Sequence, residues 1–97
     1  MSSSAPPVVF AITGPITRAD LPGLCVRVCA LLERSDAGVA VCDVSGVEPD
    51  AVTVDALARL QLTAKRLGCR MRLRDASAEL LELVAFMGLA DVLPEER

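Results

Sequence analysis

The side chains of this chain that could do chemistry are thiols and carboxylates, because the sequence contains no histidine. Histidine is the usual proton shuttle near neutral pH and the commonest metal ligand. Its absence excludes Ser-His-Asp and Cys-His nucleophile systems and most zinc sites. The cysteines have no two-residue gap of the zinc-knuckle or thioredoxin type. Since free cysteine behaves as a small hydrophobe, we predict buried thiols in a reducing compartment and no metal or cofactor. The alternative is a metal or redox role, for which Cys25 and Cys29 could share a helix face.

Carboxylates near the expected strand ends are the remaining candidates for catalysis. Asp43, Glu48, Asp50 and Asp75 could in principle supply an acid/base pair. No positioned nucleophile, oxyanion donor set or glycine-rich phosphate loop accompanies them. The sequence therefore predicts a protein that is not an enzyme.

Three arginines alternate at Arg70, Arg72 and Arg74 and could hold an anion or a nucleotide phosphate. A row of this kind is more often the solvated face of a strand. The formal net charge of −3 disfavours binding along a phosphate backbone, and only two aromatic residues, Phe10 and Phe86, are available for base stacking. We predict no nucleic acid among the partners.

Apolar spacing predicts three strands at residues 8–12, 39–44 and 69–74, each followed by a helix. The first helix follows a cap at Thr17 or Asp20. The second begins between Asp50 and Val54 and runs to residue 67, and the third follows Ser77 and ends at Gly88. The buried faces of these helices are expected to include Leu31, Leu67 and Met87 respectively.

Strands alternating with helices indicate an α/β fold with a small mixed, mostly parallel sheet. The arginine row indicates that the helices cover mainly one face, because a sheet covered on both faces has apolar strands throughout.

A length of 97 residues fits one domain, which we place at residues 7–97. Residues 1–6 are expected to form a flexible N-terminus. No apolar stretch predicts membrane insertion or a secretory signal, so we expect a cytoplasmic protein.

The chain resembles the STAS domain family, the module of bacterial anti-sigma factor antagonists and of sulfate-transporter tails. The resemblance rests on an apolar strand with an Asp-x-Ser-Gly-Val ending and on the order of later motifs. These motifs lie at residues 41–47, 65–73, 75–77 and 83–89, with a turn at residues 12–16. It implies a βα superhelix with helices on one side, which agrees with the arginine row.

The family's regulatory residue is a serine or threonine in an Asp-Ser-Ser-Gly segment that opens the second helix, and phosphorylation there breaks the complex. Here the acid is kept as Asp50, but the serine positions fall on Ala51 and Val52, which carry no hydroxyl. Thr53 stands where the family has glycine. It is either a helix cap or a relocated phosphoacceptor.

The resemblance implies a non-catalytic regulatory module of a bacterium that lacks the usual phosphoacceptor. Its partner would be an anti-sigma factor or GHKL-type kinase. The alternatives are an accessory subunit of a transport or signalling complex, and a sensor of a lipid or nucleotide. The expected partner-binding loop contains Ser45, Glu48, Asp50, Ala51, Val52 and Thr53.

Phe86 lies off the apolar stripe of the third helix and has two interpretations. It is either an aromatic anchor for the partner or a flank residue covered by residues 89–93. The sequence does not indicate the oligomeric state.

Overall fold

The computed structural model describes residues 6–96. Of the expected flexible N-terminus, residues 1–5 lie outside the described residues. The elements follow in the order β1 (Val8–Gly14), the 3-10 turn η1 (Arg18–Asp20), α1 (Leu21–Glu33), β2 (Val39–Val47), α2 (Ala51–Arg66), β3 (Arg70–Arg74) and α3 (Ala78–Phe86).

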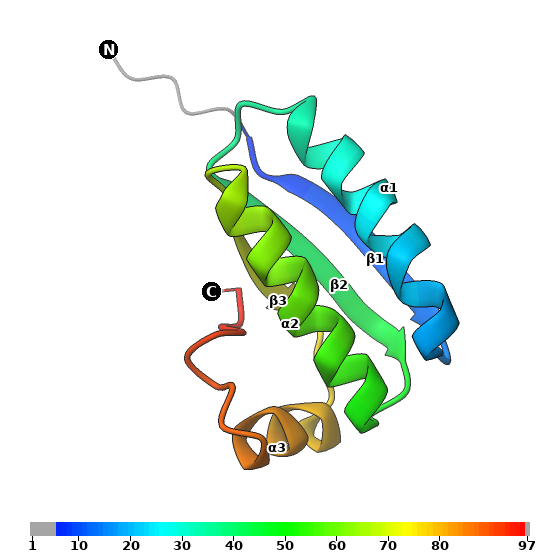
Figure 1. The fold of residues 1–97 in the computed structure, drawn as a ribbon. Helices are drawn as coiled ribbons and strands as arrows, with labels where there is room; N and C mark the ends of the chain where they lie inside the picture. Colours follow the sequence, from blue (N-terminus) through cyan, green and yellow to red (C-terminus); the bar gives the residue numbers. More distant parts are fainter. Residues whose placement is uncertain (1–5, 97) are drawn as a thin grey trace.

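The three strands form one parallel sheet in the order β1-β2-β3. The helices α1 and α2 lie side by side on one face of it, and α3 lies at the end where the strands finish (Figure 1). The predicted fold class is therefore confirmed. Because all strands run the same way, the loops and helix that follow them meet at this carboxyl end.

The core lies between the sheet and the helix pair, where alternate residues of each strand point. In β3, Met71 and Leu73 are buried against the helices, while Arg70 is exposed on the other face. In β2, Ala40, Cys42 and Val44 face the same core. The strict alternation of β3 thus gave the correct orientation from sequence alone.

Three residues expected in buried helical stripes are exposed instead. Leu31 in α1 is 43% exposed. Leu67 and Met87 are also exposed, and each lies just beyond the end of its helix. In the described part of the chain the sheet has three strands, so the outer part of the α1 stripe extends past β1 and no strand of residues 6–96 lies beneath it. Leu67 and Met87 directly follow the last residues of α2 and α3, where the chain leaves the core.

The prediction of four buried thiols is correct for two of them. Cys42 and Cys69 are buried, but Cys25 and Cys29 are half-buried on α1. Burial raises the pKa of Cys42 to about 12, with nearby Asp43 adding to the effect. A thiol in that state is chemically inert at neutral pH.

Candidate functional site

The predicted partner-binding loop lies at the carboxyl end of the sheet, between β2 and α2. Ser45, Glu48, Asp50 and Ala51 are exposed, and Val52 is half-buried. The strand β2 runs to Val47, three residues further than the sequence indicated. Ser45 therefore lies within β2 and not in the loop that follows it.

The end of β2 is shaped by the carboxylate of Asp43. Its Oδ1 accepts a hydrogen bond of 2.9 Å from the backbone N–H of Ser45. This bond, together with the Ser45 side chain and the positive charge of Arg74, lowers the pKa of Asp43. Asp43 thus remains a charged, structural group at neutral pH, bonded within its own strand.

The first turn of α2 is capped by Asp50, whose Oδ1 accepts a hydrogen bond of 2.8 Å from the backbone N–H of Thr53. The interpretation of Thr53 itself as the helix cap is therefore wrong. Its side chain is fully buried, and Oγ1 has no hydrogen-bond partner among the described residues. A kinase could reach this hydroxyl only if the first turn of α2 opened.

Phe86 is the last residue of α3 and is 87% exposed. The segment that was expected to cover it turns away instead. Leu93 enters the core, and the N–H of Leu89 donates to the carbonyl of Val84 at 2.9 Å. The interpretation of Phe86 as a covered flank residue is therefore wrong.

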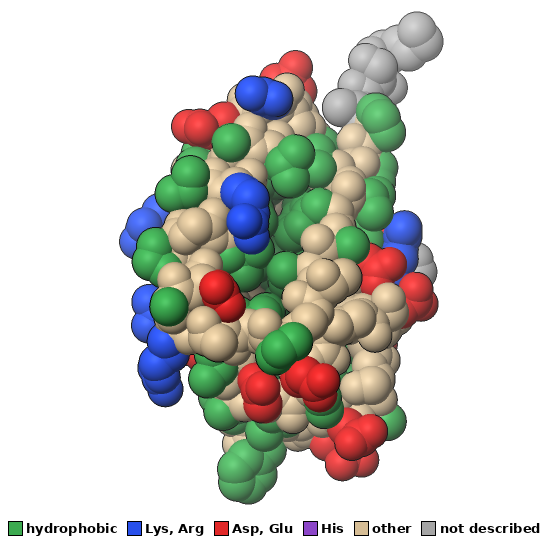
Figure 2. Space-filling model, turned by 90° about the vertical axis from the view of Figure 1, so that its right-hand side faces the viewer, with side chains coloured by type: hydrophobic (Ala, Val, Ile, Leu, Met, Phe, Trp, Pro, Cys, Tyr) green, Lys and Arg blue, Asp and Glu red, His purple; other side chains and the backbone are tan. Residues whose placement is uncertain are grey.

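Negative charge gathers around this end of the molecule. The segments 43–55 and 75–91, which include the β2–α2 loop and α3, contain eight Asp and Glu and no Lys or Arg. Figure 2 shows acidic side chains clustered at the lower end of the face it presents. We call the exposed part the carboxyl-end surface, defined by Glu48, Asp50, Glu79, Glu82 and Phe86.

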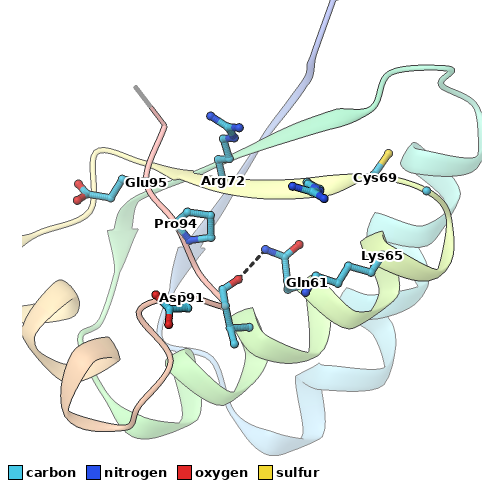
Figure 3. A pocket seen from close by; sticks show the side chains of 10 residues that line it. Gln61, Lys65, Cys69, Arg72, Asp91, Pro94 and Glu95 are labelled. Carbon is cyan, nitrogen blue, oxygen red and sulfur yellow. Dashed lines mark hydrogen bonds between the residues drawn. The ribbon is translucent and has the colours of Figure 1, made fainter.

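A hollow of about 800 Å³ lies between α2, β3 and the C-terminal segment. Of its cations, Lys65 and Arg72 lie on opposite sides of β3 in Figure 3. Arg74 is not available either, because its guanidinium binds both carboxylate oxygens of Glu96 at 2.7 and 2.8 Å. Arg70 and Arg72 both line the hollow, so the arginine row offers two guanidiniums there rather than three.

The floor of that hollow is sealed by Gln61, a buried residue that the sequence analysis did not single out. Its Nε2 donates to the carbonyls of Met71 at 2.8 Å and Val92 at 2.7 Å, and its Oε1 accepts from the N–H of Met71 at 2.9 Å. The bond to Val92 is drawn in Figure 3. The signal was present in the sequence, because Gln61 is a polar residue inside the stripe formed by Leu57, Leu60 and Ala64.

No cluster of three or more metal-ligating side chains occurs in residues 6–96. Within the same range, no helix has the length and apolar character needed to span a bilayer.

The fold is similar to the solved structure of the anti-sigma factor antagonist SpoIIAA in its unphosphorylated form, with a TM-score of 0.65 and 10% sequence identity. The match covers 92% of this chain and 78% of that chain. No curated protein matches the sequence.

Residues 2–94 match the family model described as "Mlab, STAS domain". The chain belongs to the STAS domain family, as its sequence motifs predicted.

Proposed function

We propose that this chain is a non-catalytic regulatory module that binds a partner protein through the carboxyl-end surface. One observation supports the proposal above the others: Phe86 is 87% exposed at the tip of α3. Burial of an exposed aromatic side chain by a partner lowers the free energy of the complex, and such residues dominate the energetics of interfaces.

The surroundings of Phe86 define the chemistry of the partner. Glu79 and Glu82 lie on the same helix. Glu48 and Asp50 lie in the β2–α2 loop, at the same end of the sheet. We infer a partner that offers an apolar pocket for the phenyl ring within a basic surface. Complementary charge of this kind speeds association and fixes orientation.

Binding of this kind would be constitutive rather than switched by phosphorylation. Ala51 and Val52 carry no hydroxyl, and the hydroxyl of Thr53 is buried. Constitutive binding fits an accessory subunit of a transport or signalling complex as well as an anti-sigma factor antagonist. The buried free thiols Cys42 and Cys69 favour a reducing compartment, the cytoplasm.

The test is affinity purification with mass spectrometry, in which the wild type is compared with Phe86→Ala. The matched control is Val26→Ala, which truncates a hydrophobic residue that is 68% exposed on α1. We expect a specific partner to be lost from Phe86→Ala and kept by Val26→Ala, with the melting temperature of both variants unchanged. The partner that the wild type binds should dissociate as the salt concentration rises from about 0.05 to 0.5 M, because salt screens the attraction between opposite charges.

A second variant, Thr53→Val, separates constitutive from switched binding, because it removes the hydroxyl and keeps the packing of the buried side chain. Its partner list should equal that of the wild type if Thr53 is not a phosphoacceptor. If all three variants retained the same partners as the wild type, the carboxyl-end surface would not be the binding site.

A further inference from the structure

The outer edge of β1 has no paired strand among residues 6–96. β1 pairs only with β2, and no other segment of residues 6–96 forms a ladder with it. Its seven residues, Val8–Gly14, include no charged side chain. Proteins usually block such an edge with charges, prolines within the strand or covering segments, because exposed backbone N–H and C=O groups attract another strand.

The opposite edge of the sheet, along β3, is covered by other parts of the chain. On β3, the side chain of Gln61 bonds both backbone groups of Met71. The C-terminal segment then bonds both backbone groups of Leu73, through the carbonyl of Pro94 at 2.8 Å and the N–H of Glu96 at 2.7 Å. One edge is thus fully occupied, and the other is open.

A groove runs beside the open edge, under α1. Two adjoining hollows of about 250 and 280 Å³ share Ile12, Thr13, Leu24 and Arg27 among their lining residues. Figure 2 looks onto this side of the molecule and shows a hollow with hydrophobic side chains on its floor. A strand paired with β1 would place every second side chain in this groove.

The apolar stripe of α1 is wider than the sheet that it covers. Leu24 and Val28 are buried on β1, but Leu31 is 43% exposed at the rim of the groove and Phe10 is half-buried below it. One additional strand beyond β1 would cover both side chains.

We propose that the outer edge of β1 accepts an extended segment of another protein, which adds to the sheet as a further strand. The segment carries apolar side chains toward the groove and one carboxylate toward Arg27. This mode of recognition combines backbone hydrogen bonds with side-chain pockets.

The charge of the groove selects this occupant over a second copy of the chain. Arg27 makes no ion pair or side-chain hydrogen bond within residues 6–96, although its charge helps to lower the pKa of Asp20. The nearby carboxylate of Asp20 is engaged, because its Oδ2 accepts from the N–H and hydroxyl of Thr17 at 2.9 and 3.0 Å. The β1 strand of a second copy contains no carboxylate to meet Arg27.

The experiment uses the full chain, labelled with ¹⁵N, and a short synthetic peptide in which valine alternates with threonine and one valine is replaced by glutamate. Titration should shift the backbone amide signals of Val8–Gly14 and slow the hydrogen exchange of alternate amides in that strand. Two control peptides carry glutamine in place of glutamate, or proline in place of two threonines. The glutamine peptide should bind several-fold more weakly, and the proline peptide should not bind.

Matched variants locate the site on the protein. Leu31→Gln should weaken binding of the glutamate peptide roughly fivefold or more, because it removes apolar surface that the added strand would bury. Leu62→Gln changes a leucine that is 56% exposed on α2, away from the groove, and should leave the affinity unchanged. Both residues are exposed, so both variants should fold.

Three results would overturn the proposal. The first is an absence of shifts in β1 at millimolar peptide. The second is equal affinity of the Leu31→Gln and Leu62→Gln variants. The third is movement of the β1 signals with protein concentration alone, which would assign the edge to a second copy. Phe86→Ala should not change the peptide affinity, so this test is independent of the carboxyl-end surface.

Discussion

Replacing Gln61 with leucine should strongly destabilise the fold, although leucine is apolar and similar in size. Three hydrogen bonds disappear, and the N–H and C=O of Met71 and the C=O of Val92 lose their partner. An unpaired buried polar group costs about 1–3 kcal/mol. The Val92 carbonyl is only partly buried and can bind water, so two groups carry the cost. We expect Gln61→Leu to lose about 2–6 kcal/mol of the free energy of unfolding.

The assay is urea unfolding followed by circular dichroism, with thermal melts as a second measurement. For a domain of this size, each kcal/mol moves the melting temperature by about 4–8 °C. The matched control is Thr63→Ala on the same helix, which removes one exposed hydrogen bond of 3.2 Å and should change stability by less than about 0.5 kcal/mol. A loss below about 1 kcal/mol in Gln61→Leu would show that water reaches Met71 and that Gln61 does not seal the edge of β3.

The Gln61→Glu variant tests the same geometry through its pH dependence. A glutamate here must be protonated to donate a hydrogen bond to the Met71 carbonyl, so its pKa in the folded state should be raised by burial and by that carbonyl. A raised pKa gives stability at low pH that is lost as the pH rises through the folded-state pKa. The stability deficit relative to wild type should therefore be smaller at pH 4 than at pH 7. An equal deficit at both values would contradict this account.

Two further predictions use isolated features of the structure. Thr53→Val replaces a buried hydroxyl that has no partner with a methyl group, so the free energy of unfolding should rise by up to about 1 kcal/mol in urea titrations, and a loss of stability would show that Oγ1 is hydrogen-bonded. The bidentate bond to Arg74 lowers the pKa of Glu96 below its ordinary value of 4.5. The stabilisation is therefore complete above that value and is lost as the pH falls below it. Glu96→Gln should flatten that part of the stability–pH curve and leave stability at neutral pH slightly reduced.

The sequence predicted the elements and their faces well because hydrophobic periodicity is a local property. The capping residue Ser77 was also readable, since its side chain bonds an N–H group only three residues away. The cap of α2 was not, because the sequence offered Thr53 and the structure uses Asp50. The sequence underestimated β2, because Ser45 and Gly46 are typical of a turn. Pairing of Gly46 with Thr13 of β1 keeps that segment extended, and such pairing is invisible in the local pattern.

The candidate site was only partly predictable for the same reason. Its position followed from the resemblance to a family, and the exposure of Phe86 fitted one of the two interpretations that its helical phase allowed. The burial of Thr53 depends on where the first turn of α2 sits against the core, which no spacing within the sequence specifies. Likewise, the spacing of Leu31 is typical of a core residue, and its exposure depends on how many strands lie beneath α1.

The departures from simple amphipathic patterning in this chain are its most informative residues. Gln61 places a polar group inside an apolar stripe. Its side chain bonds the backbone of β3 and so closes that sheet edge, which an apolar residue could not do. Leu31 and Phe86 place apolar groups in water, which costs free energy unless a partner covers them. A sheet of three strands that seals one edge with its own side chain and C-terminal segment could seal the other by the same means. That it leaves β1 uncharged beside an apolar groove favours a molecule with two separate contact surfaces, one at its carboxyl end and one along β1.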